Sequence, residues 1–147
     1  EPLGDVTFDL VVAPHHALTQ LRQPLAPADL MAHRIVAVAD STRSLDTLTV
    51  GILPGQDVLT LATLSDKRDA LLRGLGCGYM PQYVVQDDVA AGRLVRLTVD
   101  QPPRTSTAHL AWRQSGPQAG KALQWWLDHL AQPGTRQALI SSAPRCM

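Results

Sequence analysis

The stretch Leu61–Pro81, LATLSDKRDALLRGLGCGYMP, contains the end of a strand, a helix, a glycine turn and a second short strand. Thr63 or Ser65 can cap the helix, because a side-chain oxygen at that position accepts an otherwise unpaired backbone N–H. Apolar residues near helical spacing give the helix one face for burial. They are Leu64, Ala70, Leu71, Leu72 and Leu75. The stretch therefore predicts a strand–helix–strand unit in the middle of the chain.

Three alternate glycines, Gly74, Gly76 and Gly78, follow this helix rather than precede it. A glycine loop that binds phosphate comes before its helix, so that the first N–H groups of the helix face the ligand. The glycines are therefore interpreted as a helix end and a tight turn into the next strand. The end of the helix that suits a ligand is Thr63–Ser65, where free N–H groups and two hydroxyls converge and could hold a small anion.

Apolar strands and amphipathic helices alternate on both sides of this unit. Strands are predicted over residues 6–13, 35–39, 58–62, 94–99 and 106–113, and helices over 27–33, 82–91 and 120–132. This alternation is typical of an α/β sandwich with a mixed sheet. Residues 133–147 are expected to be weakly ordered apart from a short turn at 136–140.

A polar loop, Asp40-Ser41-Thr42-Arg43, follows the predicted strand at 35–39. In open α/β sheets, ligands bind outside the carboxyl ends of strands, so this loop is a candidate wall of a ligand site. A surface turn capped by Asp40 or Ser41 explains the same residues equally well. Both interpretations stay open at this point.

The composition limits the classes of function. The chain has 147 residues, of which 45% are hydrophobic, and this suits one domain or two small lobes with a real core. Its 13 basic and 13 acidic residues balance, which argues against a grip on nucleic acid by this chain alone. No apolar run approaches the roughly 20 residues of a membrane span. Two cysteines do not make a disulfide framework, and they fit a reducing cytoplasm.

A search for catalytic and metal-binding patterns finds no candidate, and no cofactor is predicted. His15 and His16 are adjacent, so in an extended chain their side chains point to opposite sides and do not share an ion. Cys77 has no base and no electropositive setting beside it, and it is interpreted as a small buried residue.

Two side-chain pairs on predicted helices are given structural roles. Asp87 and Asp88 are interpreted as an exposed charge pair on the helix at 82–91. Trp125 and Trp126 lie on or near the apolar face of the last helix, and they are interpreted as packing residues because large rings dominate small cores.

Four segments occur in one order: VTFDLVVAPHHAL, RIVAVADSTR, the stretch quoted above, and GRLVRL…HLAWR…GKALQWWLDHL. In that order they resemble the effector-binding domain of LysR-type transcriptional regulators, over roughly residues 3–132. The resemblance implies a type-II periplasmic-binding-protein-like fold, in which two α/β subdomains flank a cleft and are joined by two crossing strands. It also implies a non-enzymatic, cytoplasmic protein that binds a small-molecule effector and forms a homodimer or homotetramer.

On that fold, the chain is expected to divide into four parts. Residues 1–13 would be a crossing strand from a truncated first subdomain, and 14–106 the second regulatory subdomain. Residues 107–132 would be the second crossing strand and the C-terminal helix of the first subdomain, followed by the tail at 133–147. The chain is thus expected to be a C-terminal fragment, without the winged helix-turn-helix through which the family binds DNA, and with no membrane contact.

The effector contacts of the family correspond, on this lobe, to six residues of the sequence. They are Thr63, Leu64, Ser65, Ser41, Thr42 and Pro14. The helix end at Thr63–Ser65 is suited to a carboxylate or a similar small anion. The alternative is a solute-binding protein of the same fold that serves transport. An enzyme on this fold would need a catalytic group in the cleft, and the sequence offers none.

Overall fold

The structure, a computed structural model, describes residues 1–39, 51–113 and 120–141. Its strands are β1 (Pro2–Val12), β2 (Ile35–Val38), β3 (Val58–Leu61), β4 (Gly78–Pro81), β5 (Val95–Leu97) and β6 (Arg104–His109). Its helices are the 3-10 helix η1 (Ala17–Gln20) and the α-helices α1 (Pro27–Met31), α2 (Leu64–Leu72), α3 (Gln82–Ala90), α4 (Lys121–Leu130) and α5 (Pro133–Ser141).

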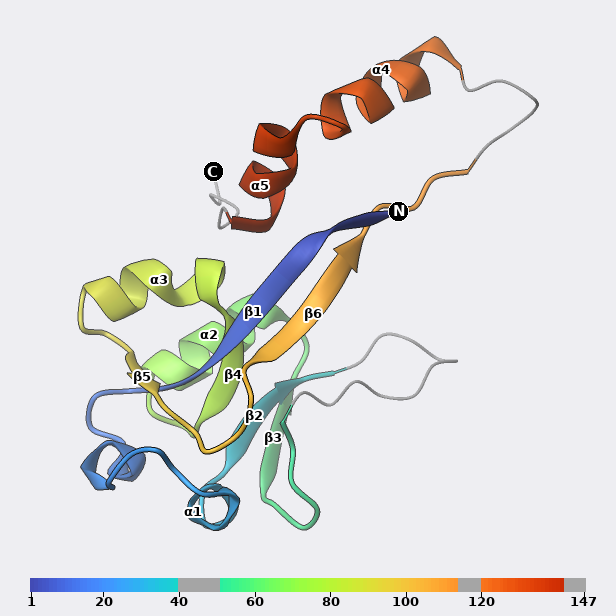
Figure 1. The fold of residues 1–147 in the computed structure, drawn as a ribbon. Helices are drawn as coiled ribbons and strands as arrows, with labels where there is room; N and C mark the ends of the chain where they lie inside the picture. Colours follow the sequence, from blue (N-terminus) through green and yellow to red (C-terminus); the bar gives the residue numbers. More distant parts are fainter. Residues whose placement is uncertain (40–50, 114–119, 142–147) are drawn as a thin grey trace.

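The sheet is organised around the long strand β1 (Figure 1). The carboxyl half of β1 pairs antiparallel with β4 on one side and β5 on the other, and its amino half pairs antiparallel with β6. The parallel pair β2–β3 joins β4 through the parallel bridge between Ile35 and Cys77. The antiparallel sheet β4-β1-β5 and the parallel pair β2–β3 are thus linked by one bridge next to β4, which gives the mixture of strand directions that the sequence predicted.

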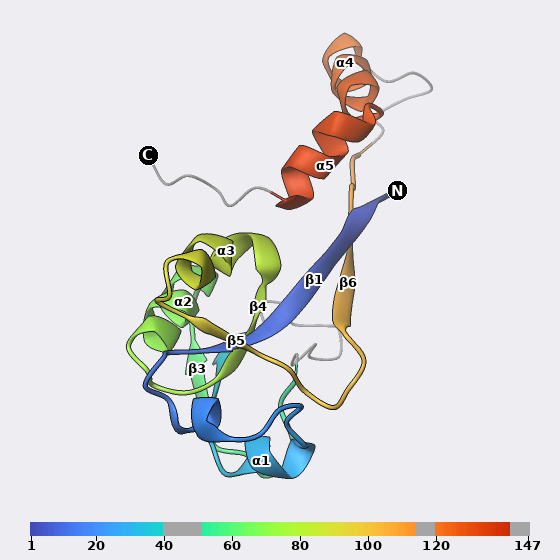
Figure 2. The same cartoon turned by 60° about the vertical axis from the view of Figure 1, so that its left-hand side comes forward.

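Side chains of β1 alternate between two cores, because successive side chains of a strand point to opposite faces. Leu10 and Val12 pack with Tyr79 and Leu97 in the core on the side of η1 and α1. Val11 belongs to the other core, which contains the buried residues of α2 and α3. Figure 2 shows α2 and α3 together on one side and α1 at the lower end, apart from them. The strand β1 thus contributes buried side chains to both cores.

The central stretch folds as predicted, and the structure adds a reason for its glycines. Thr63 caps α2, since its Oγ1 accepts the N–H of Asp66 at 3.0 Å. Gly74 has a φ of +75° at the end of the helix, a left-handed conformation that favours glycine. Gly76 is needed for a close approach: a Cβ there would lie 2.5 Å from the backbone oxygen of Arg34. The glycines thus let β4 run close beside β2.

The C-terminal residues differ from the expected weakly ordered tail, because Pro133–Ser141 form the helix α5. Proline suits the first position of a helix, where its missing N–H is not needed. Arg136 of α5 donates to the carbonyl oxygens of Leu130 at 2.5 Å and of Pro2 at 3.1 Å, and it pairs with Glu1. These contacts hold α5 against the start of β1. Residues 142–147 lie outside the described residues.

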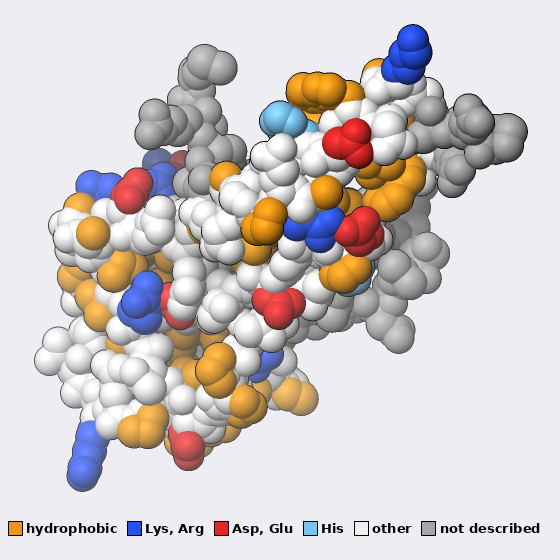
Figure 3. All heavy atoms as spheres, turned by 45° about the horizontal axis from the view of Figure 1, so that its top comes forward, with side chains coloured by type: hydrophobic (Ala, Val, Ile, Leu, Met, Phe, Trp, Pro, Cys, Tyr) orange, Lys and Arg blue, Asp and Glu red, His pale blue; other side chains and the backbone are white. Residues whose placement is uncertain are grey.

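The tryptophan pair of α4 does not pack in a core of the described residues, so the packing role predicted for it is not seen within them. Trp125 and Trp126 are each 55% exposed, and no residue of α4 is buried. The two rings meet edge to face at 5.1 Å, and Trp125 stacks on His129. Figure 3 shows orange side chains beside a pale-blue histidine near the top of the view. An apolar helix face of this kind usually packs against another surface.

Candidate functional site

The amino end of α2 lies at the carboxyl edge of the β2–β3 pair, because β3 ends at Leu61 and α2 begins at Leu64. Thr63 and Ser65 are exposed there, and Leu64 is half-buried. Among the described residues, no hydrogen bond uses the Ser65 hydroxyl or the N–H groups of Leu64 and Ser65. Three of the six predicted site residues are therefore together, with polar groups available to a ligand.

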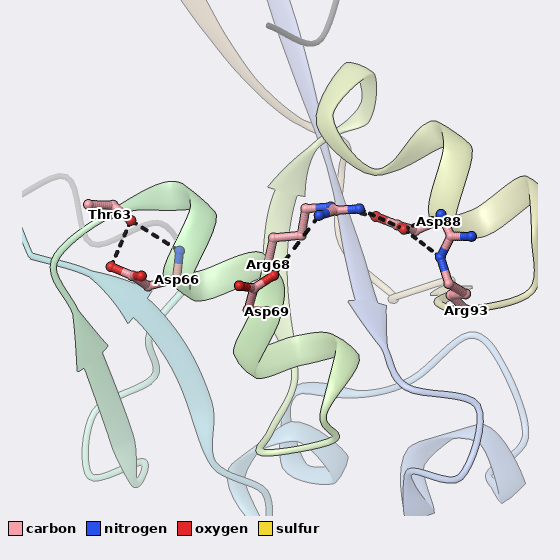
Figure 4. A network of polar contacts seen from close by, with 6 residues as sticks. All are labelled: Thr63, Asp66, Arg68, Asp69, Asp88 and Arg93. Carbon is pink, nitrogen blue, oxygen red and sulfur yellow. Dashed lines mark hydrogen bonds and ion pairs between the residues drawn. The ribbon is translucent and has the colours of Figure 1, made fainter. Parts of the chain in front are cut away.

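Asp66 adds a negative charge to the same helix end (Figure 4). Its carboxylate accepts the hydroxyl proton of Thr63 at 2.7 Å, while its N–H donates to the Thr63 oxygen at 3.0 Å. A carboxylate in the first turn already offsets part of the positive end of the helix dipole. The site thus offers N–H and hydroxyl donors beside a carboxylate acceptor. A site for a simple anion would have the donors without the carboxylate.

The structure does not bring Pro14 to this place. β1 runs antiparallel to β4, with Phe8 opposite Pro81 and Val11 opposite Gly78. Residues that follow β1 therefore lie at the amino edge of β4, beyond Gly78. His15 confirms this position, because a Cβ on Gly74, at the far end of α2, would collide with the His15 ring at Nε2. Pro14 is exposed at that opposite edge. Ser41 and Thr42 lie outside the described residues.

Two paired strands extend from the sheet toward α4 and α5 (Figure 1). They are the amino half of β1 and the whole of β6, paired antiparallel from Pro2–His109 to Phe8–Arg104. Thr107 of β6 donates to the Asp5 carboxylate across the pair at 2.7 Å. The two strands thus form an antiparallel ribbon, and their predicted role as crossing strands between two lobes stays a prediction.

Lys67 is a buried charge on α2 that the sequence analysis missed. It is 6% exposed, and its Nζ donates to the backbone oxygen of Tyr79 at 2.8 Å. Burial lowers the pKa of Lys67 to about 8, since a low-dielectric interior disfavours the charged amine. The spacing could have indicated this, because Lys67 lies three residues after Leu64 and four before Leu71, on the face that α2 buries.

A pH-dependent stability difference follows from Lys67. Between about pH 8 and its ordinary pKa of 10.5, the unfolded chain binds more protons at this amine than the folded chain does. The free energy of unfolding therefore rises with pH in that window. We expect urea unfolding to show that wild type gains stability relative to Lys67→Met from pH 8 to 10. Lys121→Met is the matched control, because Lys121 is exposed; equal pH dependence in the two variants would contradict the assignment.

Asp88 corrects the prediction of an exposed acidic pair on α3. Its side chain is 1% exposed and lies between two arginines (Figure 4). Arg68 of α2 contacts it through Nε at 2.6 Å and Nη2 at 2.9 Å, and Arg93 through Nη2 at 2.7 Å. Burial alone would raise the pKa of Asp88, but the hydrogen bonds and charges of the two arginines hold the pKa below its ordinary value. The cluster joins α2 to α3 and to the turn before β5.

The described residues hold no group of three or more side chains suited to a metal ion. Cys77 is 1% exposed, and burial raises the pKa of its thiol to about 11, so the reactive thiolate is scarce at neutral pH. Its interpretation as a small buried residue is confirmed. Within the described ranges, no helix has the length and apolar character needed to cross a bilayer.

The family model described as the LysR substrate binding domain matches residues 1–133. The chain belongs to the LysR substrate-binding domain family. A relative in Escherichia coli K12, named probable HTH-type transcriptional regulator YhaJ, is 41% identical over 122 residues, which cover 82% of this chain and 39% of that protein. The HTH-type transcriptional activator AllS of Klebsiella pneumoniae is 36% identical over 94 residues, 64% of this chain and 35% of that protein. This LysR-family chain thus spans 35–39% of the length of these relatives.

Solved LysR-type regulators share the fold at lower identity. Full-length LysG from Corynebacterium glutamicum has a TM-score of 0.63 and 19% identity, over 98% of this chain and 46% of that one. The regulatory domain of AphB from Vibrio vulnificus has a TM-score of 0.60 and 20% identity, over 89% of this chain and 67% of that one. The periplasmic-binding-protein-like α/β fold predicted from the sequence is confirmed.

Proposed function

We propose that this chain is the effector-sensing and oligomerising part of a LysR-type transcriptional regulator. The observation that carries the proposal is the amino end of α2, where Thr63, Leu64 and Ser65 present hydroxyls and N–H groups at the edge of the sheet. The names of the curated relatives support it, and nothing in the described residues favours the transport alternative. An effector would shift the two lobes only by its difference in affinity for their arrangements.

The chemistry of this helix end favours a zwitterionic effector or a hydroxy acid. A carboxylate of the ligand would accept from the N–H groups of Leu64 and Ser65 and from the Ser65 hydroxyl. An amine or hydroxyl of the ligand would donate to Asp66, which a simple anion could not use. One LysG structure, with a TM-score of 0.60, carries Arg as its bound effector, and an amino acid has both groups.

DNA binding and assembly would involve further parts of a longer protein, since the relatives are longer than this chain. DNA contact would come from a winged helix-turn-helix outside this chain, since the 13 basic residues here are balanced by 13 acidic ones. The exposed tryptophans of α4 would pack against the rest of the first lobe, and assembly would give a homodimer or homotetramer. The protein would act in the cytoplasm and would catalyse no reaction.

The double variant Thr63→Ala with Ser65→Ala tests this site in the longer regulator. The variant removes the hydrogen bond from the Ser65 hydroxyl to a charged ligand group, worth about 1.5–3 kcal/mol, and the Thr63 hydroxyl that positions Asp66, so effector affinity is expected to fall at least about tenfold. Affinity is measured by calorimetry with amino acids and hydroxy acids that shift the melting temperature of the wild type. Thr60→Ala is the control, because Thr60 is an exposed hydroxyl residue of β3. Unchanged affinity in a folded double variant would move the effector elsewhere.

A further inference from the structure

A cavity of about 290 Å³ lies where β1, β4 and β5 meet the turn into β6. It opens on the sheet face opposite α2, because the lining residues Leu10, Tyr79 and Leu97 belong to the core on the η1 and α1 side. Phe8 packs against that core, and Pro102 and Pro103 add further apolar wall. The cavity is therefore separate from the helix end at Thr63.

Two buried hydrogen-bond donors line this cavity without a partner among the described residues. One is the hydroxyl of Tyr79, a residue that is 3% exposed, and the other is Nε of Arg104. The Arg104 guanidinium lies 4.6 Å from the centre of the Tyr79 ring, so the two groups are neighbours. A buried polar group without a partner costs about 1–3 kcal/mol, and native proteins keep few such groups. Two such donors beside each other indicate that a hydrogen-bond acceptor belongs in the cavity between them.

The charges around the cavity favour an anion as that acceptor. Asp9 also lines the cavity. Its Oδ1 accepts from Gln82 at 3.0 Å, and its buried Oδ2 makes no hydrogen bond but forms an ion pair with Arg96 Nε at 2.5 Å. Arg104 donates through Nη2 to the neutral side chain of Gln101 at 3.1 Å. No carboxylate of the described residues forms an ion pair with Arg104. The carboxylate of Asp9 thus has a cationic partner in Arg96, whereas the guanidinium of Arg104 has no carboxylate partner among the described residues.

We propose that this cavity is a second ligand site, which binds a small carboxylic acid with an apolar body. The carboxylate lies between the Tyr79 hydroxyl and Arg104 Nε, and the apolar body lies against Phe8, Leu97 and the two prolines. The volume is at the small end of ligand pockets, which run from about 300 to 1,000 Å³, so the acid is about as large as benzoate. Arg104 is the first residue of β6 and pairs with Phe8, so occupancy fixes the place where the second crossing strand leaves the lobe.

Benzoate and isovalerate are the probes, titrated into the 147-residue chain and followed by calorimetry and by amide NMR shifts. At least one is expected to bind saturably, with shifts at residues 97–104. Arg104→Met keeps the length of the side chain and should weaken binding at least tenfold. Tyr79→Phe removes one oxygen, keeps the ring, and should weaken binding about fivefold, the equivalent of about 1 kcal/mol. Benzyl alcohol, the neutral analogue of benzoate, should bind at least tenfold more weakly.

The variant Thr63→Ala separates this site from the proposed effector site. It should leave the affinity for the probes unchanged. If binding weakens in Thr63→Ala but not in Tyr79→Phe or Arg104→Met, the probes occupy the helix end and the cavity proposal is wrong, while the effector site stands. If neither probe saturates at millimolar concentration, the cavity holds water only, and the proposal is overturned.

Discussion

Replacement of Asp88 by Ala is expected to destabilise the chain by about 3 kcal/mol, the lower end of the range for breaking a buried ion pair. The carboxylate is 1% exposed, whereas Arg68 and Arg93 are 34% and 55% exposed, so the freed arginines can regain water. The loss is nevertheless large, because one carboxylate joins α2, α3 and the turn before β5. Equilibrium unfolding in urea measures it.

Asp87→Ala is the matched control for Asp88→Ala. Asp87 is the neighbouring residue on the same helix and is exposed, so its replacement should change stability by no more than about 0.5 kcal/mol. Similar losses in the two variants would mean that the arginine contacts of Asp88 contribute little.

Acid should remove the contribution of Asp88. Its pKa is held below the ordinary value of 3.8 in the folded chain, so the folded state binds this proton less readily than the unfolded state does. The stabilisation is complete above about pH 4 and is lost as pH falls through the folded-state pKa. The stability difference between wild type and Asp88→Asn should therefore shrink below pH 4; a constant difference would contradict the assignment.

Gly76→Ala is expected to cost about 2–3 kcal/mol, the upper part of the range for overpacking. The added Cβ would lie 2.5 Å from the backbone oxygen of Arg34 and 3.1 Å from Cγ2 of Val36. The oxygen of Arg34 accepts the N–H of Cys77 at 2.9 Å, so the clash also strains the link between β2 and β4. Backbone cannot move aside as the end of a flexible side chain can. Thermal and urea unfolding measure the loss.

Gly92→Ala separates this clash from the usual cost of replacing a glycine. Gly92 has a φ of +70°, and no atom lies within 4 Å of a Cβ placed there. Its replacement should cost about 1 kcal/mol, from backbone strain alone. If Gly76→Ala costs no more than Gly92→Ala, the close approach of Arg34 does not require a glycine.

The fold and the central helix could be predicted from local patterns, whereas the contacts that were missed join distant segments. Thr63 as the cap of α2 follows from a few neighbouring residues. The buried state of Asp88 depends on Arg68, which lies 20 residues away. The helix α5 depends on Arg136 reaching Pro2, 134 residues away. Periodicity reports which face of an element is buried, but it does not name the partner.

The candidate site shows the same division. Thr63, Leu64 and Ser65 are consecutive, so their position at one helix end follows from the helix alone. Pro14 was predicted to join them, but the antiparallel direction of β1 places it at the opposite edge, and no periodicity reveals a strand's direction. The Tyr79–Arg104 cavity was not predicted either, because its two donors come from different strands.

The direct test of the central claim is the coding sequence upstream of Glu1. A LysR-type regulator requires a segment for a winged helix-turn-helix, followed by the α/β half-lobe to which the crossing strands lead, and this is the result we predict. A secretion signal followed by a similar half-lobe would contradict the proposed regulator function and would favour a solute-binding protein that serves transport.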